Sequence, residues 1–283
     1  MEESAAMATR LYDLFPRVRG DLRYEPTAKR VRAKLGEHTV ADSTAALLVW
    51  EPRRVVPCYA FALDDLHADL QPSSAPVPEG VAEIALLHMG HPFAMHSSEG
   101  DALDVVVDGR TLEGAAFRPA DPDLDGHVVL EFEAFQWYEE EEPIIAHPRD
   151  PFHRVDILSS SRHVRIELDG ELLAESSRPI LVFETGLPMR FYLPPEDVVA
   201  ELRPTDKRTF CAYKGEASYR ALTVGGAERD DIVWGYEQPL RQAAEIAGRV
   251  AFFDEKVDVI LDGRRREKPR TALSKSIVDE AGS

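Results

Sequence analysis

Two stretches of the chain decide the fold: residues 30–51 read RVRAKLGEHTVADSTAALLVWE, and residues 163–184 read HVRIELDGELLAESSRPILVFE. At a constant offset of 133 positions the two share Val31 and Val164, Arg32 and Arg165, Leu35 and Leu168, Ala41 and Ala174, Ser43 and Ser176, Leu48 and Leu181, Val49 and Val182, and Glu51 and Glu184. This offset far exceeds the period of a solenoid repeat, so each copy should be a complete folding unit. The repeat predicts two tandem domains, residues 1–143 and 144–283.

Alternating polarity predicts antiparallel strands within each copy. Val164, Ile166 and Leu168 fall on one face of a strand, and Asp169 with Gly170 follows as a hairpin turn. The next run, residues 179–183, is apolar throughout, which is typical of a strand covered on both faces. We expect its counterpart at residues 46–50 and further strands at residues 103–107, 232–236 and 249–253.

Helix signals are few and short. Pro194 and Pro195 precede two acidic residues and an apolar stripe, which predicts a helix start with a first-half counterpart near residues 64–70. Residues 240–247, closed by Gly248, predict a second helix. The sequence therefore predicts a mainly β protein of antiparallel strands with a few short helices.

Charge and proline content place the boundary between the two domains. Residues 139–142 are four glutamates, and the following segment, residues 147–156, contains prolines, Phe152 and Val155. Like charges and prolines discourage regular structure, whereas the apolar residues favour an ordered connector. We expect residues 271–283 to form a tail or a frayed helix.

The net charge of −18 opposes binding to a phosphate backbone or an anionic membrane, so we expect neither nucleic acid nor membrane as a partner. Arg203, Lys207 and Arg208 could form a local basic pocket, or they could be solvated loop charges. The opening residues lack a basic region followed by an apolar stretch, and no segment approaches the ~20 apolar residues of a membrane helix. We therefore expect a cytoplasmic protein.

Candidate metal ligands are poorly spaced for a metal site. Cys58 and Cys211 are the only cysteines, which fits a reducing compartment and excludes a zinc site of paired cysteines. His88, His91 and His96 do not share one helix face or one strand face. Residues 121–126 imitate a calcium loop, but the twelfth position lacks the required glutamate, which leaves a turn rich in aspartate. We expect no metal and no cofactor.

The clearest chemical signal is Cys211, Tyr213 and Lys214 in front of Gly215. A lysine becomes a nucleophile or base when burial lowers its pKa, and a nearby cation can activate a cysteine. Lys214 and Cys211 are therefore the candidate catalytic residues. The alternative is a turn with an exposed lysine and a buried cysteine.

Several motifs of the second half together resemble one known family. They are residues 184–188 (ETGLP), 191–192 (FY), 211–219 (CAYKGEASY), 232–236 (IVWGY) and 246–253 (IAGRVAFF). In this order they resemble the domain of unknown function 427 family, which is catalogued under a nucleotidyltransferase-like name. The chain looks like the tandem, actinobacterial-type arrangement of two such domains. The resemblance implies a β-tent-like domain, similar to the β domain of methionine sulfoxide reductase B and to the ligand-binding domain of cereblon, and it supplies no established reaction.

The residues themselves do not support nucleotidyl transfer, because the chain has no glycine-rich loop that opens a helix to hold phosphates. The first half also departs from the family motif: residues 91–100 read HPFAMHSSEG, without a lysine or a thiol. Either this copy has lost its site, or His96 and Glu99 form a different one.

Aromatic residues are concentrated in the motifs that match the family. An aromatic pocket with few polar groups suits a flat or cationic small ligand, although the same rings could be core residues. The expected ligand-binding residues are Glu184, Tyr192, Tyr213, Lys214, Tyr219, Trp234 and Tyr236. The leading hypothesis is a small molecule of unknown identity bound by the second domain. An enzyme that uses Lys214 or Cys211 and a structural or interaction module are the alternatives, and the oligomeric state stays open.

Overall fold

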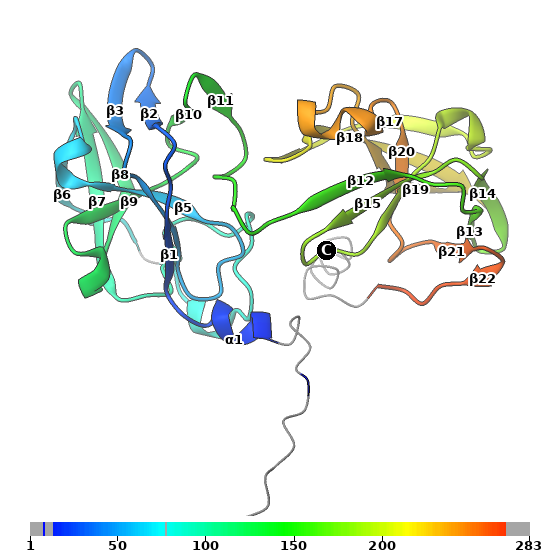
Figure 1. The fold of residues 1–283 in the computed structure, drawn as a ribbon, viewed down its shortest axis with the longest axis horizontal. Helices are drawn as coiled ribbons and strands as arrows, with labels where there is room; N and C mark the ends of the chain where they lie inside the picture. The colour runs from blue at the N-terminus through cyan, green and yellow to red at the C-terminus, as the bar shows by residue number, and fades with distance from the viewer. Residues whose placement is uncertain (1–7, 9–13, 77, 270–283) are drawn as a thin grey trace, which may run out of the picture. The chain divides into compact units, whose positions relative to one another are not determined.

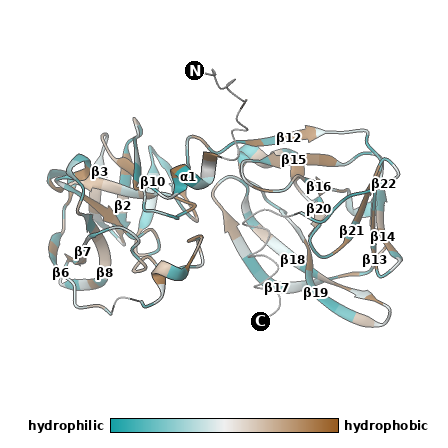
Figure 2. Cartoon of the chain, turned by 90° about the horizontal axis from the view of Figure 1, so that it is seen from below, coloured by the Kyte–Doolittle hydropathy of each residue, from teal (hydrophilic) through white to brown (hydrophobic). Residues whose placement is uncertain are grey.

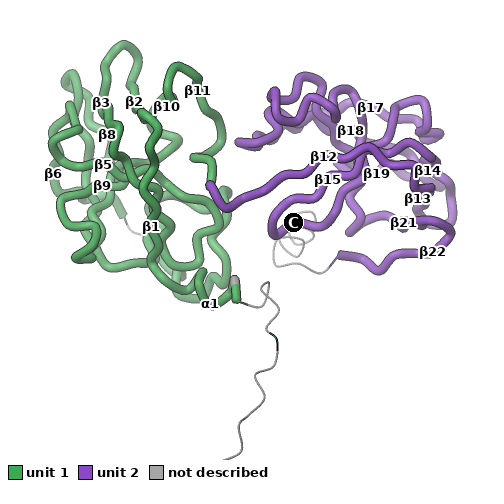
Figure 3. Tube along the Cα trace, in the orientation of Figure 1, with its two compact units in different colours: residues 1–150 green, residues 151–283 purple. Residues whose placement is uncertain are grey.

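The computed structural model describes residues 8, 14–76 and 78–269. The chain divides into two compact units, residues 1–150 and 151–283 (Figure 3). The regular structure of both units is mainly antiparallel strands (Figure 1). The predicted mainly β fold is thus confirmed, and the division falls seven residues after the boundary expected from the repeat.

The first unit contains two sheets. Its elements are α1 (Phe15–Arg19), β1 (Arg23–Pro26), β2 (Val31–Leu35), β3 (His38–Ser43), β4 (Leu47–Trp50), β5 (Cys58–Ala62), η2 (Leu63–Asp65), β6 (Asp69–Pro72), η3 (Val81–Glu83), β7 (Gly100–Val107), β8 (Arg110–Pro119), η4 (Pro122–Leu124), β9 (His127–Leu130), β10 (Gln136–Glu139) and β11 (Glu142–Ile144), where η marks a short 3-10 helix. The large sheet has the order β1-β4-β5-β9-β8-β7-β6, and the small sheet has the order β11-β10-β2-β3.

The second unit repeats this strand order. Its elements are β12 (Val155–Ser159), β13 (Val164–Leu168), β14 (Glu171–Ser176), β15 (Ile180–Glu184), β16 (Arg190–Tyr192), η5 (Pro195–Asp197), β17 (Leu202–Cys211), β18 (Gly215–Val224), β19 (Ala227–Gly235), η6 (Arg241–Ile246), β20 (Val250–Phe252), β21 (Asp258–Leu261) and β22 (Arg264–Arg265). The sheet β12-β15-β16 joins β17-β18-β19-β20 through Leu193 and Val250, whose N–H groups donate to each other's carbonyls at 2.7 and 3.0 Å. The order β14-β13-β21-β22 corresponds to the small sheet of the first unit.

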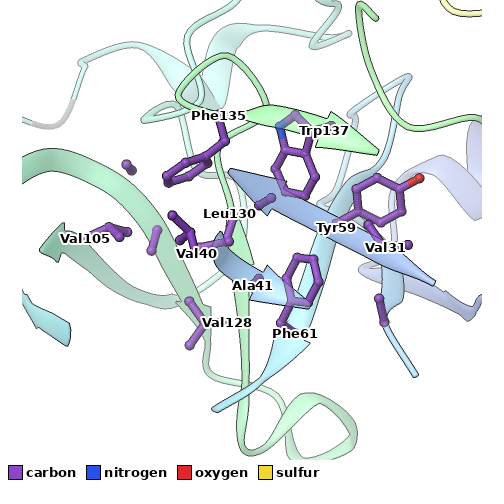
Figure 4. Close-up of a cluster of buried hydrophobic side chains, with 14 of the residues drawn as sticks. Val31, Val40, Ala41, Tyr59, Phe61, Val105, Val128, Leu130, Phe135 and Trp137 are labelled. Atoms are coloured by element: carbon purple, nitrogen blue, oxygen red, sulfur yellow. The ribbon is translucent and has the colours of Figure 1, made fainter. Parts of the chain in front are cut away.

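A hydrophobic core fills the space between the large and small sheets of each unit. Hydrophobic and hydrophilic bands follow one another along the strands (Figure 2), as expected when one face of each strand is buried. In the first unit the rings of Tyr59, Phe61 and Trp137 gather in this core (Figure 4), with the Trp137 centroid 5.3 Å from Tyr59 and 6.0 Å from Phe61.

A second apolar cluster covers the opposite face of each large sheet. In the first unit it includes Leu47, Val49, Ala60, Phe93 and Phe117, and in the second unit Ile180, Val182, Tyr192, Trp234 and Tyr236. The strand registers make these faces equivalent: Phe117 pairs with Ala102 in the first unit as Trp234 pairs with Tyr219 in the second. We call this the outer face of the large sheet.

The helix predicted from Pro194 is wrong. Only Pro195–Asp197 forms one 3-10 turn, and Val198 is extended and bridges to Ala174 of β14. The N–H of Val199 donates to the carbonyl of Leu173 at 2.9 Å, so sheet pairing replaces the helical hydrogen bonds. The first-half counterpart is likewise wrong, because η2 is followed by strand β6.

The second predicted helix is a 3-10 helix, η6, which is kinked at Ala243. Gly248 follows it with φ +67°. The predicted tail over residues 271–283 lies outside the described residues. In the part of the chain that is described, no helix has both the length and the apolar character to span a membrane.

Candidate functional site

Three segments of the second unit bring polar side chains to one point beside the outer face. Glu184 is the last residue of β15, Lys214 lies in the turn between β17 and β18, and His153 precedes β12. Strand β12 pairs with β15 so that Val155 stands opposite Glu184. This pairing places His153, two residues earlier, next to the carboxylate.

The turn that carries Lys214 depends on a glycine. Gly215 has φ +102°, a conformation that L side chains rarely adopt, and a Cβ at this position would lie 3.3 Å from the backbone nitrogen of Leu240. The N–H of Leu240 also donates to the carbonyl of Lys214 at 2.9 Å. The segment that follows β19 therefore fixes the backbone of Lys214.

One carboxylate accepts hydrogen bonds from two basic side chains. Nζ of Lys214 donates to Oε2 of Glu184, and Nε2 of His153 lies 3.0 Å from Oε1. The side chains of Lys214, Glu184 and His153 are 8%, 9% and 20% exposed. Charges this deeply buried are tolerated only when they are paired, so each side chain of this cluster supports the others.

The environment keeps both Glu184 and Lys214 charged at neutral pH. Burial alone would favour the neutral carboxyl, but hydrogen bonds from His153 and Lys214 and the Lys214 charge lower the pKa of Glu184 to about 2. Burial likewise opposes the Lys214 charge, but Glu184 and Cys211 raise the pKa of the ammonium. Lys214 is therefore a cation and a hydrogen-bond donor here rather than a nucleophilic amine.

Cys211 and Tyr213 border the same cluster. The thiol of Cys211 is half-buried, contributes to the raised pKa of Lys214 and accepts the backbone N–H of Tyr213 at 3.5 Å. The Tyr213 ring stacks on His153 with a centroid distance of 4.4 Å and an interplanar angle of 19°. The structure thus joins Cys211, Tyr213, Lys214 and Glu184 in one place.

The remaining aromatic candidates form part of the core next to this cluster. Tyr192, Tyr219, Trp234 and Tyr236 are all buried. Nε1 of Trp234 donates to Oη of Tyr192 at 3.1 Å, and burial raises the pKa of both Tyr192 and Tyr236. The Tyr219 hydroxyl lies 3.0 Å from that of Thr209. These rings form an apolar wall beside the cluster and pack within one hydrophobic cluster.

His153 is the member of the cluster that the sequence reasoning missed. It lies in the connector, outside every motif that matches the family. Its place beside Glu184 follows from the pairing of β12 with β15, which the residues around His153 do not reveal.

The first unit carries a related cluster around Glu51, the residue equivalent to Glu184. Oε1 of Glu51 lies 3.1 Å from Nδ1 of His96, and Oε2 accepts the N–H groups of Ser97 and Ser98 at 2.7 and 3.2 Å. Arg54 Nε lies 3.4 Å from Oε1 without hydrogen-bond geometry, while its Nη2 donates to the Phe93 carbonyl at 2.8 Å. Both oxygens of the Glu51 carboxylate thus have hydrogen-bond partners within the first unit.

The structure brings His96 to Glu51 rather than to Glu99. The His96 ring stacks on Phe117 at 3.8 Å with an interplanar angle of 11°, and its Nε2 is buried without a hydrogen-bond partner among the described residues. Glu99 is exposed and lines a surface depression with Asp101 and Asp121. The two candidate residues of the first unit therefore face different surroundings.

Basic residues on β17 are paired with acids. Arg203 forms an ion pair with Glu228, Lys207 Nζ lies 3.3 Å from Asp231, and Arg208 Nε lies 3.4 Å from Glu216. All three basic side chains are substantially exposed, so they are solvated ion pairs and not a basic pocket. Among the described residues, no three His, Cys, Asp or Glu side chains are grouped to hold a metal ion.

Fold and site together define a two-unit β protein with a buried carboxylate at the equivalent position of each large sheet. Residues 156–263, which lie within the second unit, match the model of the family described as "Domain of unknown function (DUF427)". The family resemblance identified from the sequence is thus confirmed. The matched region includes Glu184, Cys211 and Lys214 and begins three residues after His153. No curated protein matches the chain.

Proposed function

We propose that the second unit binds a small molecule at the cluster of Glu184, Lys214 and His153, beside the ring of Tyr213. The observation that carries this proposal is a carboxylate, an ammonium and an imidazole joined by hydrogen bonds at 8–20% exposure. A buried ion pair stabilises a fold no better than apolar residues of the same volume, and buried groups with shifted pKa values gather at functional sites.

The surroundings fit a ligand site on a β scaffold. A few converging polar groups beside an apolar wall orient a small ligand, and the outer-face rings supply that wall. Lys214 and Glu184 neutralise each other, which favours a neutral or singly charged molecule over a polyanion. The net charge of −18 acts in the same direction.

Loss of the ion pair should abolish binding. In the double variant Glu184→Gln with Lys214→Met, neither a buried charge nor its partner is left. We expect the low-molecular-weight fraction of a cell extract to raise the melting temperature of the wild type and not that of this variant. Lys207→Met, which removes an exposed lysine of the neighbouring strand β17, is the matched control and should behave as the wild type. An equal shift in the double variant would contradict the proposal.

A second candidate is thiol chemistry at Cys211, which is favoured by the electrostatic interaction between Cys211 and the Lys214 ammonium. A cysteine beside a cation is the usual setting of a reactive thiol. Cys58 provides an internal comparison, because burial raises its pKa to about 12.

Alkylation should separate the two cysteines. We expect iodoacetamide to modify Cys211 in the native protein at least ~100-fold faster than Cys58, which should react only after unfolding. Peptide mass spectrometry of a time course at about pH 7.5 gives both rates in one sample, and Cys211→Ser and Cys58→Ser confirm the assignment. Equal rates in the native protein would eliminate the thiol candidate.

We further infer that the first unit is a diverged copy of the second. The common strand order, the offset of 133 residues and the equivalent Glu51 and Glu184 support a tandem repeat. A β-tent-like shape, the actinobacterial-type arrangement and a cytoplasmic location stay predictions from the sequence.

A further inference from the structure

Both units place an imidazole on the equivalent carboxylate, although the two histidines come from different parts of the chain. Nδ1 of His96 donates to Glu51 at 3.1 Å, and Nε2 of His153 donates to Glu184 at 3.0 Å. His96 lies in the loop before β7, whereas His153 lies in the connector before β12.

Inheritance from a common repeat does not explain the two histidines. The residue 133 positions before His153 is Gly20. His96 lies six residues before Ala102, and six residues before the equivalent Tyr219 the second unit has Tyr213. His96 thus occupies the position of Tyr213, and each unit places an imidazole on the equivalent carboxylate from a different segment of the chain.

Each ring also stacks on an aromatic side chain, although Phe117 corresponds to Trp234 and not to Tyr213. His96 stacks on Phe117 at 3.8 Å and 11°, and His153 stacks on Tyr213 at 4.4 Å and 19°. In each case a planar ring presents an N–H to a buried carboxylate and a face to an aromatic side chain. These two contacts describe the kind of ring that each buried carboxylate holds.

The two imidazoles differ in how firmly they are held. The His96 side chain is 9% exposed, and Arg54 holds its loop by donating to the carbonyls of Phe93 and Met95 at 2.8 and 3.0 Å. The His153 side chain is 20% exposed and lies between two exposed residues, Phe152 and Arg154. The second unit can therefore exchange its imidazole more easily than the first.

We propose that the ligand of the second unit is a planar nitrogen heterocycle whose ring N–H donates to Glu184 and whose face stacks on Tyr213 in the place of His153. This inference rests on the proposed function and names its ligand class. The His153 imidazole competes with the heterocycle, and the first unit is closed by its own imidazole.

The test uses the full chain with His153→Ala and small probes. At about pH 8.5, where imidazole is neutral, we expect the variant to bind imidazole and pyrazole at least ~10-fold tighter than the wild type, because the competing ring is gone. Thiazole, which lacks a ring N–H, should bind at least ~10-fold more weakly than imidazole. Adding Glu184→Gln should remove imidazole binding. Isothermal titration calorimetry measures each of these affinities.

The matched control is His163→Ala, which removes an exposed imidazole lying 3.0 Å from Glu175. It should bind imidazole no better than the wild type. If His153→Ala does not fold, the wild type titrated with imidazole should show the His153 ring signals moving to those of a solvent-exposed histidine in NMR spectra.

Two results would overturn the heterocycle assignment: His153→Ala binding imidazole no better than His163→Ala, or thiazole binding as well as imidazole. If His153→Ala does not fold, the assignment is overturned when the His153 signals of the wild type do not move at saturating imidazole. The extract-dependent rise in melting temperature is independent of these probes. If it persists, the proposed function stands with a ligand of another class, and if it is also absent, both proposals fail.

Discussion

Replacing Glu184 with Gln is expected to lower the free energy of unfolding of the second unit by about 3–5 kcal/mol. The amide leaves the ammonium of Lys214, 8% exposed, without its carboxylate. The amide keeps one acceptor oxygen, so only one of Lys214 and His153 can still donate to residue 184. Because the chain divides into two compact units, native-state hydrogen exchange of the β15 and β18 peptides is the measurement that reports on the second unit alone.

The double variant Glu184→Gln with Lys214→Met should recover much of this loss. Removing both charges leaves no uncompensated ion, so the two substitutions should be strongly non-additive. Lys207→Met removes an exposed pair with Asp231 and should change the unfolding free energy by less than about 1 kcal/mol. Additive effects of the two cluster substitutions would show that Glu184 and Lys214 are not coupled.

Replacing Asp254 with Asn is expected to stabilise the second unit at neutral pH by about 3 kcal/mol. Burial raises the pKa of Asp254 from 3.8 to about 6, despite opposing contributions from Arg190 and Arg266. A raised pKa means that the folded state favours the protonated acid. The contribution of Asp254 to stability is therefore complete below about pH 4 and is lost as the pH rises through about 6. In urea denaturation, the stability gained by the variant over the wild type should therefore be small below about pH 4 and grow as the pH rises through about 6.

The neighbouring residue Glu255 gives a control of opposite sign. Its carboxylate accepts two hydrogen bonds from Arg190, at 2.8 and 2.7 Å, and its side chain is 1% exposed. Glu255→Gln should therefore destabilise the unit at neutral pH. An Asp254→Asn variant that is no more stable than the wild type at pH 7.5 would contradict the pH argument.

Much of the fold could be predicted from the sequence repeat. Alternating residues such as Val164, Ile166 and Leu168 do form strand β13, because their period matches a strand with one buried face. Val198 shows where local signals fail: prolines and acids favoured a helix there, but β14 was available for pairing. Whether Val198 forms a helix or pairs with β14 depends on a strand elsewhere in the chain, so the residues around Val198 alone cannot predict it.

The candidate site was only partly accessible from the sequence. Glu184, Cys211 and Lys214 could be named because they lie in compact motifs, but their mutual contacts depend on how β15 meets the β17–β18 turn. His153 could not be named from its surroundings, because its role follows from the pairing of β12 with β15. Trp234 could equally be a core ring or a contact residue by composition, and the structure buries it.

Native mass spectrometry of the chain purified from cells, compared with the denatured chain, tests the ligand site most directly. We predict an extra mass on the wild type and on Lys207→Met that denaturation releases, and a bare mass for the double variant Glu184→Gln with Lys214→Met. A bare wild type, or the same extra mass on the folded double variant, would contradict the assignment of the site to Glu184, Lys214 and His153.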